Sequence, residues 1–156
     1  MLVYLLRHGE AKSRRRWAEA DDLRPLNKQG RLQADALVDA LAEVPIARVL
    51  ASPSVRCRKT VEPIAAARGV RLEPDARLAE GTGSEGALEL LDTLEDDPAR
   101  AAILCTHGDV VQLTVQHLEA AGVVFEGPIL AAKGAAWVLH GSGGAVTAAS
   151  YLPPPA

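Results

Sequence analysis

The chain has 156 residues, of which 48% are hydrophobic and 24% are charged, and its net charge is −3 at pH 7. This length and balance predict one globular domain, residues 1–156, with a hydrophobic core of its own. The negative net charge argues against general affinity for nucleic acid or membranes, although it allows a local basic pocket.

Neither the N-terminal residues nor the cysteines indicate a secreted or membrane protein. The apolar run Leu2 to Leu6 is too short for a signal peptide and is followed by Arg7. No stretch approaches the roughly 20 apolar residues that a membrane-spanning helix needs. Cys57 and Cys105 lack the spacing of a metal or redox motif, so we expect two reduced thiols in a cytoplasmic protein.

The first half of the chain alternates strand and helix patterns. Leu2 to Leu6 predicts a buried strand, and the polar stretch Gly9 to Leu26 predicts a long loop. Apolar residues at helical spacing predict a helix over 28–44, which Pro45 ends. A second strand is predicted over 47–51.

The second half continues this alternation. Ser52-Pro53 predicts a helix start, with serine at the N-cap and proline at the first position, and Gly69 predicts its end. The remaining predicted elements are a short strand over 70–73, a loop over 78–83, a helix over 84–96, a strand over 101–105, a helix over 108–122, and a hairpin of 135–139 with 145–150. The pattern predicts a layered α/β domain whose sheet has an antiparallel edge.

Three of the predicted strands run into residues suited to anion binding. In chain order these are Arg7-His8-Gly9, Ser52-Pro53 with Arg56 and Arg58 in the following helix, and Thr106-His107-Gly108. Ligands of open α/β sheets bind beyond the carboxyl ends of the strands. If these strands are parallel and adjacent, the two histidines and at least two arginines meet at one edge.

These residue types suit a phosphate group. Arginine forms planar, bidentate hydrogen bonds to phosphate oxygens. Helices that begin after Ser52 and His107 would add backbone N–H donors and a positive dipole end. A neutral imidazole among such donors is a competent nucleophile, and positive surroundings should lower its pKa. Gly9 and Gly108 carry no side chain that would obstruct the ligand.

The motifs LLRHGEA, ASPSVRCRKT, LAE and THGDVV resemble the four signatures of the histidine phosphatase superfamily. RPLNKQGRLQA resembles a further segment of that family, with Asn27 where threonine is usual, and the resemblance spans Leu2 to about Leu139. The short length is similar to that of the SixA-type phosphohistidine phosphatases. RCRKTVEP and KGAAWVL look most similar to histidine-phosphatase domains fused to some Nudix hydrolases.

The resemblance implies a phosphoglycerate-mutase-like fold, a three-layer α/β/α sandwich around a mostly parallel sheet with an antiparallel edge. It also implies that His8 attacks phosphorus and becomes phosphorylated, and that water then hydrolyses the phosphohistidine. Arg7, Arg56 and His107 would hold the phosphoryl oxygens and their developing charge. The family requires no metal, and we expect no cofactor.

Glu80 matches the position of the family's general acid. An alcohol leaving group needs a proton, which a carboxylic acid supplies. A phosphohistidine substrate needs less help, because a protonated imidazole leaves readily. A working Glu80 would therefore widen the substrate range, whereas an idle one would indicate phosphoramidate substrates. Asp22 and Glu85 are weaker candidates.

The predicted loop concentrates positive charge beside the expected phosphate site. Its four cations in five positions are Lys12, Arg14, Arg15 and Arg16. They would bind further phosphates of a nucleotide or acidic residues of a phosphoprotein. We expect Asp21 and Asp22 to pair within this loop and fold it back on itself.

The sequence therefore indicates a metal-independent phosphatase for phosphate monoesters or phosphoramidates, and a SixA-like phosphohistidine phosphatase is the leading interpretation. The expected partner is a phosphorylated small molecule or a phosphohistidine protein. One alternative is a phosphatase for nucleotides or sugar phosphates. A second is a non-catalytic phosphate-binding regulatory module, although such a module has no need of a nucleophile.

Overall fold

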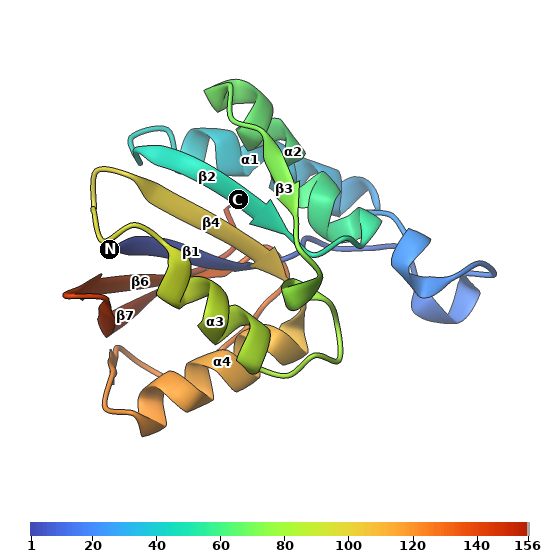
Figure 1. Cartoon of the computed structure of the whole chain (residues 1–156). Helices are drawn as coiled ribbons and strands as arrows, with labels where there is room; N and C mark the ends of the chain where they lie inside the picture. The colour runs from blue at the N-terminus through green and yellow to red at the C-terminus, as the bar shows by residue number, and fades with distance from the viewer. Residues whose placement is uncertain (156) are drawn as a thin grey trace.

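A computed structural model, which describes residues 1–155, contains one seven-stranded sheet in the order β3-β2-β4-β1-β6-β7-β5 (Figure 1). The strands are β1 (Leu2–Arg7), β2 (Ile46–Ala51), β3 (Leu72–Pro74), β4 (Ala101–Thr106), β5 (Val124–Phe125), β6 (Ala136–Ser142) and β7 (Ala145–Leu152). The strands β3, β2, β4 and β1 are parallel, and β6 is antiparallel to both β1 and β7. The predicted hairpin is therefore confirmed, but the outermost strand is β5, which runs parallel to β7.

The helices α1 (Lys28–Ala40) and α2 (Val55–Arg68) cover one face of the sheet, and α3 (Glu85–Thr93) and α4 (Gly108–Ala120) cover the other (Figure 1). The predicted three-layer α/β/α sandwich is therefore confirmed. Short 3-10 helices lie at η1 (Arg14–Arg16), η2 (Asp21–Leu23) and η3 (Ala76–Leu78). No helix within residues 1–155 is long and apolar enough to cross a membrane.

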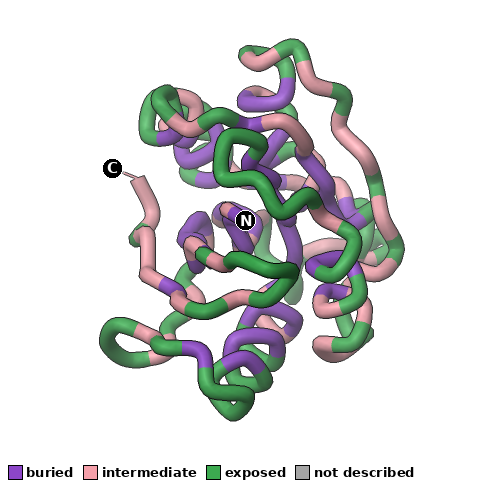
Figure 2. The backbone as a smooth tube through the Cα atoms, turned by 60° about the vertical axis from the view of Figure 1, so that its left-hand side comes forward, coloured by how far each residue is buried: buried purple, intermediate pink, exposed green. Residues whose placement is uncertain are grey.

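Alternating side chains of the central strands fill two separate cores. On β1, Val3 and Leu5 pack with the α3 and α4 side, whereas Tyr4 and Leu6 pack with the α1 and α2 side. The run is continuously apolar because both faces of a parallel sheet are covered. Figure 2 shows buried residues at the centre and exposed ones along loops and outer helix surfaces. Trp137 of β6 is fully buried in the first core.

The sheet order brings three strand ends together. The central strand β4 pairs with β1 and β2, with Arg7 opposite Thr106 and Ala51 opposite Cys105. Backbone hydrogen bonds continue past the strands, from His8 N to Thr106 O at 3.0 Å and from Ser52 N to Cys105 O at 2.9 Å. The residues that follow the three strands therefore lie at one sheet edge, as predicted.

The start of α2 differs from the prediction. The helix begins at Val55 with Ser54 at its N-cap, two residues later than the Ser52-Pro53 start. The Ser52 amide still bonds to the backbone of β4 at 2.9 Å, and its hydroxyl bonds to His107 at 2.8 Å and only at 3.4 Å to the Ser54 amide, so Ser52 continues the strand instead of beginning the helix. The predicted end is confirmed, because Gly69 adopts the left-handed conformation (φ 63°) that favours glycine.

Two further boundaries also differ. The first helix ends at Ala40 rather than 44, and a turn leads into β2. The predicted loop from 9 to 26 contains η1 and η2, and a bridge between Ala11 and Leu26 closes its base. Turns of this kind carry no hydrophobic periodicity, so the sequence pattern does not indicate them.

Candidate active site

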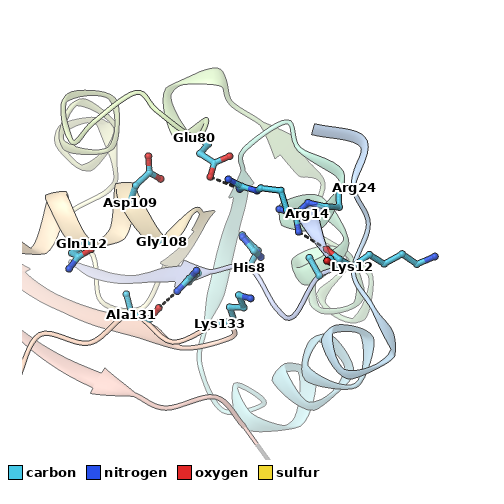
Figure 3. Close-up of a pocket in the computed structure, with 13 residues that line it drawn as sticks. His8, Lys12, Arg14, Arg24, Glu80, Gly108, Asp109, Gln112, Ala131 and Lys133 are labelled. Atoms are coloured by element: carbon cyan, nitrogen blue, oxygen red, sulfur yellow. Dashed lines mark hydrogen bonds and ion pairs between the residues drawn. The ribbon is translucent and has the colours of Figure 1, made fainter. Parts of the chain in front are cut away.

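A cavity of about 690 Å³ opens at the shared edge of β1 and β4 (Figure 3). Cations outnumber acidic residues in its lining, which includes Arg7, Lys12, Arg14, Arg24 and Lys133. His8, Glu80, Gly108 and Asp109 also line it. The cavity joins segments that are far apart in the sequence, and its charge suits an anionic ligand.

His8 is presented to this cavity as a neutral imidazole. Its Nδ1 lies 2.7 Å from the Gly9 carbonyl oxygen, which can only accept, so Nδ1 carries the proton and Nε2 keeps a free lone pair. Burial, together with the nearby charges of Arg56, His107 and Arg7, lowers the pKa of His8 to about 3 against the opposing effect of the Gly9 bond. The ring is therefore unprotonated, as a nucleophile must be.

The backbone around His8 is held from α2. The Gly9 amide donates to Thr60 Oγ1 at 3.0 Å, and the Thr60 hydroxyl donates to the Arg56 carbonyl at 2.7 Å. These two buried hydrogen bonds link the end of β1 to the helix that carries Arg56.

The second histidine, His107, is the N-cap of α4, and its ring centroid lies 5.5 Å from that of His8. Its Nδ1 accepts a hydrogen bond from Arg56 Nη2 at 3.3 Å. Its Nε2 therefore carries the proton and donates to Ser52 Oγ at 2.8 Å. Ser52 is fully buried, so the structure places this predicted phosphate ligand behind His107, outside the cavity lining.

Arg7 crosses the N-terminus of α4. Its Nη1 donates to the Ala131 carbonyl at 2.6 Å, while its buried Nε has no partner among residues 1–155. A buried donor without a partner is costly, so an anion in the cavity would satisfy it. A Cβ at Gly108 would lie 2.7 Å from Arg7 Cζ. Gly108 therefore makes room for the guanidinium group, and because it also lines the cavity its expected place beside a ligand stays a prediction.

Gly9 differs from its expected role. A Cβ there would lie 2.9 Å from Gln33 Oε1, which accepts a hydrogen bond from the Glu10 amide at 2.8 Å. Gly9 is buried and outside the cavity lining, so its missing side chain makes room for α1.

Arg56 is fully buried and lies between acidic residues from two loops. Its Nη2 donates to Asp21 Oδ2 and to Glu80 Oε2, each at 3.0 Å. Glu80 Oε1 also accepts from Arg14 Nη2 at 3.0 Å (Figure 3). The backbone next to Glu80 is held to α4, because the Gly81 amide donates to Asp109 Oδ2 at 2.9 Å.

The basic loop meets its predictions in part. Arg14 reaches into the cavity toward Glu80, whereas the Lys12 ammonium group extends away from His8 (Figure 3). Arg15 is exposed and lies outside the cavity lining. Asp21 pairs with Arg14 at 3.4 Å and so folds the loop back as expected, whereas Asp22 is exposed.

Sequence reasoning missed two cavity cations. Arg24 is 7% exposed and donates to Asp21 Oδ1 at 3.1 Å and to the Lys12 carbonyl at 2.7 Å. Lys133 lies 3.4 Å from Glu10. The signal for Lys133 was its place just before the final hairpin, whose first strand begins beside the end of β1. Arg58, in contrast, donates to the Pro53 carbonyl and does not line the cavity.

Residues 3–85 match the family described as "Histidine phosphatase superfamily (branch 1)". This chain belongs to that superfamily. An 8-oxo-(d)GTP phosphatase of Mycolicibacterium smegmatis is 32% identical over 98% of this chain and 48% of its own length. The chain therefore spans about half the length of that relative.

Solved structures agree with the fold. A protein histidine phosphatase SixA complexed with tungstate has 25% identity and a TM-score of 0.73, with 94% of this chain and 93% of that chain covered. Bacillus stearothermophilus YhfR has 20% identity and a TM-score of 0.76, with 93% of each chain covered, and supports the fold alone. The superfamily predicted from the motifs is confirmed, and so is the enzyme class at the level of the family.

Proposed function

We propose that this chain is a phosphatase that transfers a phosphoryl group from its substrate to His8 and then to water. The observation that carries the proposal is the neutral His8 ring, whose proton is held on Nδ1 at the edge of a cationic cavity. The Nε2 lone pair forms the bond to phosphorus as the bond to the leaving group breaks.

The arginines and the second histidine would supply the charge that this reaction needs. Arg7, with its unpartnered Nε, and the N-terminus of α4 would hold phosphoryl oxygens. The His107 ring lies 5.5 Å from that of His8 and contacts Arg56, and both side chains would contact the remaining oxygens when the substrate replaces their present hydrogen bonds. Positive groups in these places stabilise phosphoryl transfer without requiring a metal ion.

Glu80 is the proposed proton donor to the leaving group. It comes from the loop after η3 and lines the cavity opposite the strand ends. In this structure its two oxygens accept from Arg14 and Arg56. The carboxyl group can act as an acid only when substrate replaces these bonds, and His8 does not depend on it to attack.

As substrate we propose a phosphorylated small molecule of the nucleotide class. The 8-oxo-(d)GTP phosphatase relative supports this class. So does the position of Arg14 and Lys133 in the cavity beyond Arg7, because further phosphates of a nucleotide would meet them there. The second candidate is a phosphohistidine protein, which the similarity to SixA supports.

Phosphate release in EDTA from a small panel would test the function. The panel holds a nucleoside triphosphate and diphosphate, a sugar phosphate, p-nitrophenyl phosphate and a phosphohistidine peptide. We expect His8→Ala to lower kcat by about 10³-fold or more, because no other group replaces the nucleophile. The best substrate decides between the two candidates. Equal activity of the wild type and His8→Ala would exclude His8 as the nucleophile. Phosphate binding without any turnover would support the non-catalytic module.

A further inference from the structure

The guanidinium group assigned to the substrate is already occupied by a carboxylate of the same chain. Arg56 Nη1 donates to the Asp21 backbone carbonyl at 2.8 Å, and Nη2 donates to Asp21 Oδ2 at 3.0 Å. Glu80 Oε2 takes a third bond to the same arginine at 3.0 Å. As a result the Arg56 side chain is only 1% exposed and lies outside the cavity lining.

A carboxylate and a phosphoryl group compete for the same arginine donors. Both are oxyanions that accept from guanidinium N–H groups, and both Arg56 Nη groups already donate to acceptors of this chain, so a phosphoryl group can take an Arg56 donor only by replacing one of them. Asp21 therefore occupies one donor of Arg56 with a carboxylate oxygen and another with its backbone carbonyl, and a phosphoryl oxygen would compete for these donors. The Asp21 side chain is 41% exposed, so it can leave Arg56 for solvent without a large rearrangement of the core.

The same contact holds a long loop against the body of the protein. The base of this loop is closed by the Ala11–Leu26 bridge and by a hydrogen bond from Lys12 N to Pro25 O at 3.0 Å. Within residues 1–155, side-chain hydrogen bonds join the loop beyond its base to the rest of the chain at Arg14 and at Asp21. Both of these contacts end on the Arg56–Glu80 pair.

We propose that Asp21 is an internal competitor of the substrate, and that a bound phosphoryl group displaces it from Arg56. The inference rests on the function proposed above. Displacement breaks the tie between the loop and α2, so that occupation of the phosphate site and the position of the loop are coupled. Asp21 thereby lowers the apparent affinity of the site for an anion, because the anion must first displace the Asp21 carboxylate from Arg56.

Tungstate binding to the whole chain, measured by calorimetry, tests the competition. Asp21→Asn removes the negative charge and keeps the shape, and the matched control Glu19→Gln removes an exposed charge from the same loop. We expect Asp21→Asn to lower the tungstate Kd about threefold to tenfold, as fits the loss of a partly exposed ion pair. Glu19→Gln should leave the Kd close to that of the wild type.

Trypsin cleavage at Arg14 to Arg16 tests the coupling to the loop. Tungstate should speed this cleavage in the wild type, and Asp21→Asn should be cleaved quickly without tungstate. A thermal melt shows that the variant is folded.

The outcomes separate this proposal from the function on which it rests. Equal or weaker tungstate binding by Asp21→Asn would overturn the competition, while His8-dependent turnover by the wild type would leave the proposed function standing. Unchanged cleavage would overturn the coupling to the loop. A wild type with neither tungstate binding nor turnover would overturn both proposals.

Discussion

The two histidines of the site carry their protons on opposite ring nitrogens because their neighbours differ. A carbonyl oxygen faces Nδ1 of His8, whereas a guanidinium N–H faces Nδ1 of His107. His8 therefore offers Nε2 as a lone pair, and His107 offers it as a donor that Ser52 accepts. One backbone bond and one arginine thus give two identical side chains different tautomers, and only that of His8 fits the proposed nucleophile.

The buried His8 should make stability depend on pH. Its pKa is lowered to about 3 in the folded chain and is near 6.5 when unfolded, so between these values the unfolded chain binds the extra proton. Stability is therefore lost as the pH falls from about 6.5 toward 3. Between pH 7 and 5, urea unfolding of the wild type should lose about 2 kcal/mol more than that of His8→Gln. Equal losses in both proteins would contradict the buried neutral ring.

Gly108→Ala should lower kcat/KM strongly and change the free energy of unfolding little. The new methyl group would lie 2.7 Å from Arg7 Cζ and 2.9 Å from its Nε, so the guanidinium must move. We expect kcat/KM to fall about tenfold to a hundredfold, the range typical of a misplaced catalytic group. Alanine favours a helix, so the free energy of unfolding should change little. Leu113→Ala, an exposed site on the same helix, is the control, and equal kcat/KM in both variants would contradict the role of Arg7.

The sequence indicated some of the site residues better than others, for a physical reason. Arg7 is the last residue of β1, and His8 and His107 directly follow the parallel strands β1 and β4, so a rule about strand ends brings them together. Asp21 and Arg24 lie in a loop without periodicity, and their partners become visible only when the loop folds over α2. The sequence also did not indicate that Gly9 makes room for Gln33 and Gly108 for Arg7, because these contacts form only in the folded chain.

At the scale of elements, the long loop and α1 share one junction. Asn27 caps α1 by accepting from the Gly30 amide at 2.9 Å, and its Nδ2 donates to the Ala11 carbonyl at 3.3 Å. A Cβ at Gly30 would lie only 1.9 Å from the Glu10 carbonyl oxygen, so the helix start presses against the segment after β1. Asn27, at the position where the family usually has threonine, thus caps the helix and also holds the base of the loop.

Asn27→Ala should lower the free energy of unfolding by about 1 to 2 kcal/mol, because it removes an N-cap. Asn27→Ser keeps a capping oxygen and should retain most of this stability. Urea unfolding at equilibrium measures both, with Gln29→Ala in the exposed first turn of α1 as the control, expected to stay within about 0.5 kcal/mol of the wild type. Equal loss from the serine variant would assign the effect to the Ala11 bond instead.

The element boundaries show where pattern reasoning ends. The buried strands were predicted from short continuous apolar runs, and the amphipathic helices from apolar residues at helical spacing. The start of α2 was misplaced because the motif at Ser52-Pro53 satisfies a capping rule that tertiary contacts override. Burial of the Ser52 hydroxyl against His107 needs a partner 55 residues away.

For the whole molecule, the sheet order determines where the chemistry lies. The chain places β4 between β1 and β2, so that both histidines and the start of α2 share one edge. The final hairpin adds β6 beside β1 and brings the segment before it, with Ala131 and Lys133, to the other side of the cavity. The layers and the alternation of strands were predictable, but the closeness of this segment to Arg7 depends on strand pairing.

The chain contains two tryptophans, and they lie in very different surroundings. Trp137 is fully buried, donates to the Leu130 carbonyl at 2.7 Å, and packs against Phe125 and Tyr151 with ring centroids 5.1 Å apart. Trp17 directly follows η1, and its indole N–H donates to the Ala20 carbonyl within the same loop. The protein therefore carries two tryptophan fluorophores in different parts of the fold. The emission of Trp17 reports on the loop and that of Trp137 on the core, so fluorescence can follow the loop and the core without an added dye.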